Sequence, residues 1–171
     1  TAYSQMQTVG NVVGTIERTQ NGVTFETSSG AIVSAQLFSD QVVRVRINPT
    51  GKFERDQSYA FETPPKPKRL LFAVSENPIN IVLSAGNGVK VVIKRQPFSI
   101  DILDNGGEPI LRDDTTRPTV FDKASGEVQT SKLRRSEVET YYGFGEKAFI
   151  EMSRNGKYIV NWNTDTFAYP I

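Results

Sequence analysis

Apolar and polar residues alternate with a period of two along most of this chain, in short runs separated by glycine, proline, asparagine and aspartate. This pattern is typical of antiparallel strands joined by turns. It predicts strands at 11–18, 22–27, 31–38, 41–48, 70–75, 79–84, 89–94, 98–103 and 109–112, and less clearly at 119–122 and 127–133. Helical periodicity is almost absent, and a short helical turn is predicted only at 147–152. We therefore expect an all-β fold.

The strand predicted at 41–48 shows how alternation assigns residues to the two faces of a sheet. Valines and an isoleucine fall on one face, while Arg44 and Arg46 fall on the other. Paired arginines fit a sugar or phosphate site, but alternating charges more often form the solvated side of a strand, and we prefer that interpretation. Two stacked antiparallel sheets are expected, and the inner layer is predicted to include Val43, Val45, Ile47, Ile79, Val89, Val91, Ile93, Ile100 and Ile102.

Turn residues and prolines indicate how the strands are connected. Asn21-Gly22 and Ser29-Gly30 stand where tight hairpin turns are expected to need positive φ. The stretch 48–69 contains four prolines and several charges, so it is predicted to be an irregular excursion. Strands of the same kind resume after it, and neither side alone has enough strands for a sandwich. Residues 1–171 are therefore expected to form a single domain.

The amino-acid composition limits the kinds of partner that this chain is expected to bind. The 171 residues, 37% of them hydrophobic, are enough to bury a core without metal or disulfide support. Lysine plus arginine (20) nearly balance aspartate plus glutamate (19), so no nucleic-acid partner is expected. No apolar run approaches the roughly 20 residues that cross a bilayer, so no membrane partner is expected either. The sequence fits a cytoplasmic protein and an exported protein equally well.

The chain contains no histidine and no cysteine. This excludes a Ser-His-Asp triad, a cysteine nucleophile and histidine-ligated zinc within these residues, and no cofactor is expected. A glycosidase would need two carboxylates flanking the scissile bond. Asp113 and Asp114 are adjacent, so on a strand their side chains point to opposite faces, and a polar turn is the favoured interpretation. Asp101 is expected to face solvent.

Two segments near the end of the chain combine glycine, aromatic and polar residues. The run GFGEK at 143–147 resembles a phosphate-binding loop, but it is too short and has no βαβ context. Gly143 and Gly145 are instead expected to let the backbone turn sharply, with Tyr141, Tyr142 and Phe144 packing around them. The run NWNTDTFAY at 161–169 fits either a carbohydrate-binding loop or a loop that packs against another domain.

The order and spacing of these two segments resemble the end of the N-terminal domain of glycoside hydrolase family 31. In that family a YGxGE segment precedes a WNxD loop, and here YYGFGEK at 141–147 precedes NWNTD at 161–165. The VVRVRINP run at 42–49 is also similar to that domain, and the succession of strands resembles a galactose-mutarotase-like supersandwich. The resemblance covers most of the chain and is sharpest from Glu137 onward. For the excursion at 48–69 the resemblance identifies no counterpart.

The resemblance implies a retaining α-glycosidase whose two catalytic aspartates are carried on a (β/α)₈ barrel. The family's nucleophile segment, DxxWxDMNE, has no counterpart in this chain, and a barrel needs roughly 200 further residues. The barrel is therefore expected downstream, with the isolated chain inactive. Family members also continue with more strands of the same sandwich, so this one is expected to lack its last strands.

The resemblance also implies a substrate contact. The aspartate of the WNxD loop maps onto Asp165, with Trp162, Asn163 and Thr166 beside it, and these four are the expected substrate-binding residues. The expected partners are the barrel of the same enzyme and an α-linked carbohydrate. The alternative is a free-standing carbohydrate-binding β-sandwich module, while a purely structural interaction domain has less support. The sugar and the linkage follow from neither interpretation.

Overall fold

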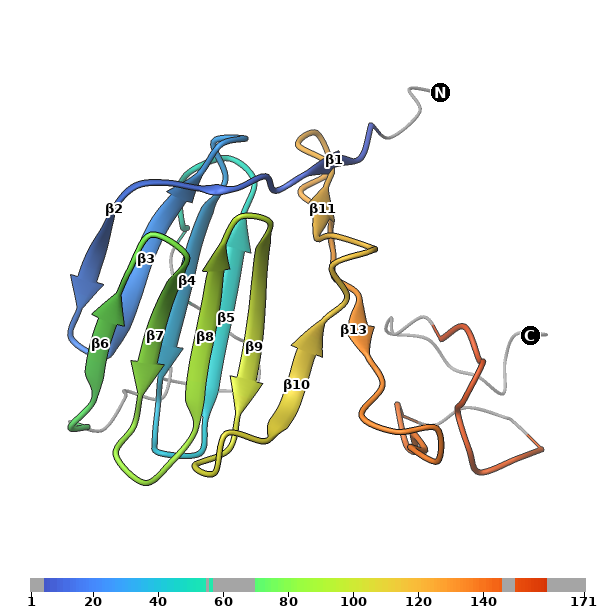
Figure 1. Ribbon diagram of the computed structural model, residues 1–171. Helices are drawn as coiled ribbons and strands as arrows, with labels where there is room; N and C mark the ends of the chain where they lie inside the picture. Colours follow the sequence, from blue (N-terminus) through green and yellow to red (C-terminus); the bar gives the residue numbers. More distant parts are fainter. Residues whose placement is uncertain (1–4, 55, 57–69, 146–149, 160–171) are drawn as a thin grey trace. The chain divides into compact units, whose positions relative to one another are not determined.

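The computed structural model describes residues 5–54, 56, 70–145 and 150–159 (Figure 1). These residues form thirteen strands and no helix, so the predicted all-β class is confirmed. Residues 150–152, the described part of the predicted helical turn, form a bend instead. Contacts divide the chain into two compact units, Thr1–Leu133 and Arg134–Ile171.

The first unit contains a four-stranded antiparallel sheet in which every strand pairs with the next in sequence. Its strands are β2 (Val12–Thr19), β3 (Gly22–Thr27), β4 (Ile32–Leu37) and β5 (Val43–Asn48), in the order β2-β3-β4-β5. Short polar turns make this meander possible, because antiparallel neighbours need only a few residues to connect them. Within the described part of the chain, β5 pairs with β4 on one side and with no strand on the other.

A six-stranded antiparallel sheet packs against the first. Its order is β13-β10-β9-β8-β7-β6, with β6 at Ala73–Glu76, β7 at Asn80–Ser84, β8 at Lys90–Arg95, β9 at Phe98–Leu103, β10 at Pro109–Asp113 and β13 at Lys132–Leu133. The β9–β10 register shifts between Pro109 and Leu111. A small third sheet, β1-β11-β12, comprises Gln7–Thr8, Val120–Phe121 and Val128–Gln129.

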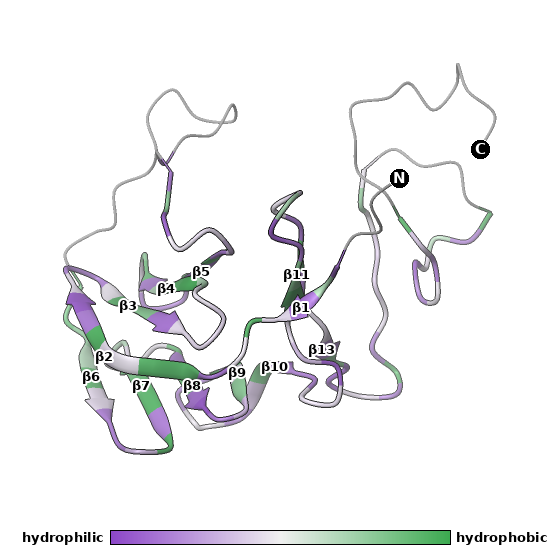
Figure 2. Cartoon of the chain, turned by 90° about the horizontal axis from the view of Figure 1, so that it is seen from above, coloured by the Kyte–Doolittle hydropathy of each residue, from purple (hydrophilic) through white to green (hydrophobic). Residues whose placement is uncertain are grey.

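The core lies between the two larger sheets, which form two layers when viewed from above (Figure 2). Phe25 of β3 and Phe98 of β9 meet edge to face across the gap, with ring centroids 6.0 Å apart and an interplanar angle of 63°. Fully buried side chains come from both layers and include Val23, Val33, Leu37, Ile81, Leu83, Val91 and Ile93. The predicted β-sandwich is therefore confirmed.

Alternation assigned most inner residues correctly. The side chains of Val89, Val91, Ile93 and Ile100 are buried, and those of Val43, Ile47 and Ile102 pack partly buried against the core. The prediction was wrong for Ile79, which is 67% exposed. It lies in the turn before β7, where the side-chain oxygen of Asn77 accepts hydrogen bonds from the backbone N–H groups of Ile79 and Asn80. Alternation does not apply before the strand begins.

Val45 is a second departure from the predicted inner layer, because its side chain remains 37% exposed. It lies on the predicted face of β5, together with Val43 and Ile47, and lines a cavity between the two sheets. Among the described residues β5 is the last strand of its sheet, and the exposure of Val45 does not come from an error in the assigned face.

The two predicted hairpin glycines have different roles. Gly30 has the expected positive φ of 81°, which an L side chain rarely adopts. Gly22 does not have a positive φ, so that prediction was wrong. A Cβ atom at Gly22 would instead lie 2.0 Å from the backbone oxygen of Ala35 on β4. Glycine is required there because two neighbouring backbones approach closely.

Candidate functional site

The four predicted substrate-binding residues, Asp165, Trp162, Asn163 and Thr166, lie outside the described residues. The described part of the second unit is the segment that precedes them, residues 134–145 and 150–159. It contains most of YYGFGEK, the first of the two motifs that carry the family resemblance.

Asn155 fastens two stretches of this segment together. Its side-chain oxygen accepts a hydrogen bond from the backbone N–H of Tyr141 at 2.9 Å, and its amide nitrogen donates to the carbonyl of Glu139 at 2.9 Å. The backbone N–H of Arg154 donates to the carbonyl of Tyr141 at 2.7 Å. Arg134 adds a bond from its guanidinium to the Glu139 carbonyl at 2.9 Å. The Asn155-Gly156 pair, which is typical of a turn, is the one signal by which this arrangement could have been found from the sequence.

The glycine-bearing stretch turns as predicted. Gly143, Phe144 and Gly145 have φ values of 85°, 68° and 83°, so three successive residues lie in the left-handed region. Phe144 is the only described non-glycine residue in this region, a conformation that costs on the order of 1–3 kcal/mol. The aromatic residues do not pack closely around the glycines, because Tyr141, Tyr142 and Phe144 are 41%, 62% and 47% exposed.

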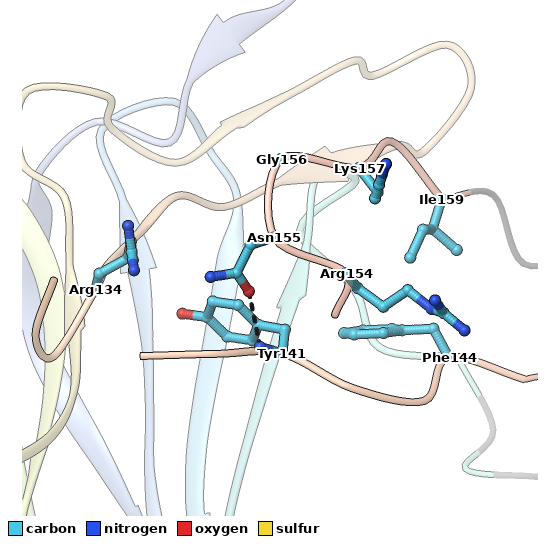
Figure 3. A pocket seen from close by; sticks show the side chains of 8 residues that line it. All are labelled: Arg134, Tyr141, Phe144, Arg154, Asn155, Gly156, Lys157 and Ile159. Atoms are coloured by element: carbon cyan, nitrogen blue, oxygen red, sulfur yellow. Dashed lines mark hydrogen bonds between the residues drawn. The ribbon is translucent and has the colours of Figure 1, made fainter. Parts of the chain in front are cut away.

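A cavity of about 440 Å³ opens beside this turn (Figure 3). It is lined by two aromatic rings, three cationic side chains, an amide, a glycine and an aliphatic side chain: Tyr141, Phe144, Arg134, Arg154, Lys157, Asn155, Gly156 and Ile159. Such a surface is suited to stacking and hydrogen bonding. No carboxylate lines it, so it offers no general acid or base of the kind a glycosidase uses.

The charged groups around this cavity already have protein partners. The Arg154 guanidinium donates to the carbonyls of Gly143 at 3.3 Å and Glu151 at 2.6 Å. Lys157 pairs with the Glu151 carboxylate at 3.1 Å, and this hydrogen bond lowers the pKa of Glu151. Partial burial of the phenol raises the pKa of Tyr141, and the nearby charge of Glu139 raises it further by a smaller amount. Tyr141 therefore keeps its proton at neutral pH.

Of the two adjacent carboxylates of the first unit, Asp114 lies in a polar turn as predicted, whereas Asp113 is the last residue of strand β10. Asp114 closes a turn, accepting hydrogen bonds from the backbone N–H of Thr116 at 3.0 Å and from its hydroxyl at 2.6 Å, and it pairs with Arg117 at 2.8 Å. These bonds, chiefly those from Thr116 and Arg117, lower the pKa of Asp114 to about 2. One oxygen of Asp113 accepts the backbone N–H of Ile100 at 2.7 Å, and the other pairs with Lys132.

The expectation that Asp101 faces solvent was wrong, because its side chain is only 13% exposed. It accepts a hydrogen bond from the backbone N–H of Asp113 at 3.2 Å and lies 3.7 Å from the Lys94 ammonium. The printed β9–β10 register runs to Ile102 and Leu111, and next to it the Asp101 and Asp113 carboxylates accept backbone N–H groups of the neighbouring strand. These carboxylates therefore maintain the sheet.

The paired arginines of β5 are also engaged within the protein. Arg44 forms a two-pronged ion pair with Asp56 at 2.6 and 2.7 Å, and this bond lowers the pKa of Asp56. The Arg46 guanidinium lies 4.5 Å from the centroid of the Phe53 ring. The same face of β5 is thus partly covered by the residues that follow the strand.

Metal and membrane chemistry find no support in the described ranges. No group of three acidic, histidine or cysteine side chains is placed to hold a metal ion there. The same ranges contain no helix long and apolar enough to cross a membrane.

Comparison with known proteins places this sandwich in a class and then in a family. The fold closely matches that of a Flavobacterium johnsoniae GH31 dextranase, with a TM-score of 0.79 at 24% identity over 93% of this chain and 19% of that one. A cycloalternan-forming enzyme from Listeria monocytogenes matches with a TM-score of 0.70 at 17% identity over 96% of this chain and 16% of that one. The chain thus shares the β-sandwich fold found within these two enzymes.

The sequence identifies the family. Residues 32–171 match the model of the glycosyl hydrolase 31 N-terminal galactose mutarotase-like domain, and the chain belongs to this family. A curated relative, alpha-glucosidase 2 of Bacillus thermoamyloliquefaciens, is 29% identical over 160 residues. That alignment covers 94% of this chain but only 19% of the relative. The family assignment made from the two C-terminal motifs is confirmed.

Proposed function

We propose that residues 1–171 are the single N-terminal β-sandwich domain of a larger, retaining α-glucosidase-type enzyme, that this domain supports a catalytic barrel, and that it performs no catalysis itself. The observation that carries the proposal is the match of residues 32–171 to a family whose members place this domain before the rest of a glycosyl hydrolase. The curated α-glucosidase extends well beyond the part that this chain matches. The carboxylates of Asp101, Asp113 and Asp114 accept hydrogen bonds from backbone N–H groups of the sandwich, which is consistent with a supporting role.

The proposal predicts that the isolated chain does not hydrolyse aryl α-glucosides, whereas the longer enzyme does. A retaining site needs two carboxyl groups about 5 Å apart, both available to substrate. The measurement is release of nitrophenol by the purified 171-residue chain and by the full-length enzyme at equal molar concentration. Activity of the isolated chain that disappears on substitution of one of its own carboxylates would show that it is a complete enzyme.

The proposed substrate contact is made by Asp165, with Trp162, Asn163 and Thr166 beside it, at the mouth of the barrel. Asp165 acts as a hydrogen-bond acceptor for a substrate hydroxyl and not as an acid, base or nucleophile. Asp165→Ala in the full-length enzyme should remove a charge-assisted bond of roughly 1.5–3 kcal/mol, which lowers kcat/KM by about ten- to a hundredfold. Asp40→Ala, at an exposed aspartate of the sandwich, is the control and should leave kcat/KM unchanged.

The result for Asp165 separates three roles. Loss of many orders of magnitude would indicate a nucleophile or an acid. Unchanged kcat/KM on short and long substrates, with a lower melting temperature, would indicate that the residue only tethers its loop. The intermediate loss supports the proposed contact.

The aromatic rings beside the 440 Å³ cavity favour one second candidate, a carbohydrate-binding module that acts without a barrel. This candidate predicts that the isolated chain binds maltooligosaccharides and that Tyr141→Ala abolishes binding. Isothermal titration calorimetry with maltotriose and maltohexaose measures this directly. If the isolated chain shows no heat of binding at millimolar oligosaccharide, the carbohydrate-binding module is ruled out and support of the barrel stays the proposed function.

A further inference from the structure

The chain contains four Asn-Gly pairs, at 21–22, 87–88, 105–106 and 155–156. Asparagine before glycine is prone to deamidation, because glycine has no side chain to hinder attack of its backbone nitrogen on the asparagine amide. The reaction needs an asparagine side chain that can turn toward this nitrogen and an N–H group that can lose its proton. All four pairs share the same two residues, so the structure decides which of them can react.

Three of the pairs are held by hydrogen bonds of the folded protein. Asn21 is only 6% exposed, and its side-chain amide donates to a backbone carbonyl at 3.2 Å. The N–H of Gly88 donates to the carbonyl of Ala85 at 2.7 Å, so the attacking nitrogen of the second pair is engaged. Asn155 uses both ends of its side-chain amide in hydrogen bonds of 2.9 Å to the backbone. Reaction at any of these pairs would first have to break one of these bonds.

The pair Asn105-Gly106 differs, because it forms the exposed tip of the turn between β9 and β10 (Figure 1). The base of this turn is fixed. The backbone N–H of Asp104 donates to the carbonyl of Glu108 at 2.8 Å, and the N–H of Glu108 donates to the Asp104 carboxylate at 2.8 Å. Within the described part of the chain, no hydrogen bond engages the side-chain amide of Asn105 or the N–H of Gly106. Both reacting groups are therefore available at this tip.

A cation lies against the peptide group that contains the attacking nitrogen. The Lys90 ammonium on β8 donates a hydrogen bond to the backbone carbonyl oxygen of Asn105 at 3.1 Å. That oxygen and the nitrogen of Gly106 belong to one peptide unit, so the negative charge left when the nitrogen loses its proton is shared with the oxygen by resonance. A charge-assisted hydrogen bond from the ammonium to this oxygen stabilises the anion that attacks.

We propose that Asn105 is a site of spontaneous deamidation in the folded protein, and that Lys90 promotes the reaction by stabilising the deprotonated Asn105-Gly106 peptide. Hydroxide removes the proton from the Gly106 nitrogen, which then attacks the side-chain Cγ of Asn105. The N–Cγ bond forms and the Cγ–Nδ2 bond breaks, and the nitrogen that leaves takes a proton from water and departs as ammonia. Water then opens the succinimide at either of its carbonyls, which gives aspartate or isoaspartate.

The products change the hairpin of β9 and β10. Either product replaces a neutral amide by a carboxylate beside Asp104. Isoaspartate also inserts one methylene group into the backbone of the turn, next to the pair of Leu103 and Pro109 at this end of the β9–β10 ladder. The reaction is therefore a form of chemical ageing that acts on one defined hairpin of the sandwich.

The test follows all four asparagines in the full-length protein during prolonged incubation in mildly alkaline buffer. Peptide mapping by mass spectrometry, with digestion at mildly acidic pH, measures the gain of about 1 Da at each site and separates isoaspartate from aspartate. In the folded protein Asn105 should react on the order of tenfold or more faster than the other three, which react only after local opening. In urea the four rates should lie within a few-fold of one another, because the fold no longer protects any site.

Two results would overturn the site or the route. A rate at Asn21, Asn87 or Asn155 in the folded protein that equals the rate at Asn105 would show that these hydrogen bonds do not select the site. Aspartate without isoaspartate at Asn105 would indicate direct hydrolysis of the side-chain amide and would exclude the succinimide.

Lys90→Gln tests the role of the ammonium. The control is Lys94→Gln, because Lys94 lies on the same face of β8 but approaches the Asp101 carboxylate at 3.7 Å. Loss of an exposed charged contact should slow deamidation of Asn105 by about two- to fivefold in Lys90→Gln, and the rate should be unchanged in Lys94→Gln. Equal rates in both variants, whether slowed or not, would overturn the role of Lys90.

The response to salt provides a second measurement on the unsubstituted protein, so that the test does not depend on folding of a variant. Added sodium chloride screens exposed charges and should slow deamidation of Asn105 in the unsubstituted protein. The same salt should have little effect in Lys90→Gln, where the charge is already absent. A rate that does not respond to salt in the unsubstituted protein would contradict stabilisation by the ammonium.

Discussion

The edge-to-face contact between Phe25 and Phe98 gives a direct test of the sandwich, because it joins β3 of one sheet to β9 of the other. Both rings are buried, with 3% and 6% exposure, and their centroids are 6.0 Å apart. Aromatic pairs in this geometry contribute about 0.5–1.5 kcal/mol beyond the area they bury. We expect a coupling energy of that size in a double-mutant cycle with Phe25→Leu and Phe98→Leu.

Leucine is the suitable replacement because it keeps the sites apolar while removing the ring. Each single variant should also lose stability through partial cavity formation, by roughly 1–3 kcal/mol. The assay is urea unfolding of the isolated chain, followed by circular dichroism near 215 nm, for the unsubstituted chain, both single variants and the double variant. The double variant should be less destabilised than the sum of the singles. Additivity within about 0.3 kcal/mol would refute a contact between the sheets at this position.

Two further predictions concern the packing of a turn and the response to acid. Gly88→Ala should destabilise the chain by about 1–3 kcal/mol in urea unfolding, because the added Cβ would lie 1.9 Å from the backbone oxygen of Asp40. The control is Gly106→Ala, whose added Cβ has its nearest contact at 3.3 Å and should change stability little. Similar losses of stability in the two variants would contradict this account. Asp114 has a pKa of about 2 against an ordinary 3.8, so its contribution is complete above pH 4 and is lost as the pH falls toward 2. Asp114→Asn should therefore flatten the pH dependence of stability in this window and lower stability at neutral pH, and an unchanged acid profile would show that the turn does not hold the carboxylate.

Local pattern determined much of this protein. The segments predicted at 22–27 and 98–103 coincide with β3 and β9, because alternation and turn residues act between neighbours in sequence. The predicted family follows from two C-terminal motifs and agrees with the family match. Neither result required knowledge of which strands lie beside one another.

The tertiary structure decided what depends on distant neighbours. Val45 follows the predicted alternation, yet it stays 37% exposed on the strand that is last in its sheet among the described residues, and alternation does not reveal a strand's place in a sheet. Gly22 is needed because the backbone of Ala35 passes too close for a side chain, not because of its own φ. Asp101 is covered because it lies against neighbouring strands, where it accepts the backbone N–H of Asp113 and approaches the Lys94 ammonium. Alternation assigns a residue to a face, but the pairing and stacking of strands decide whether that face is covered.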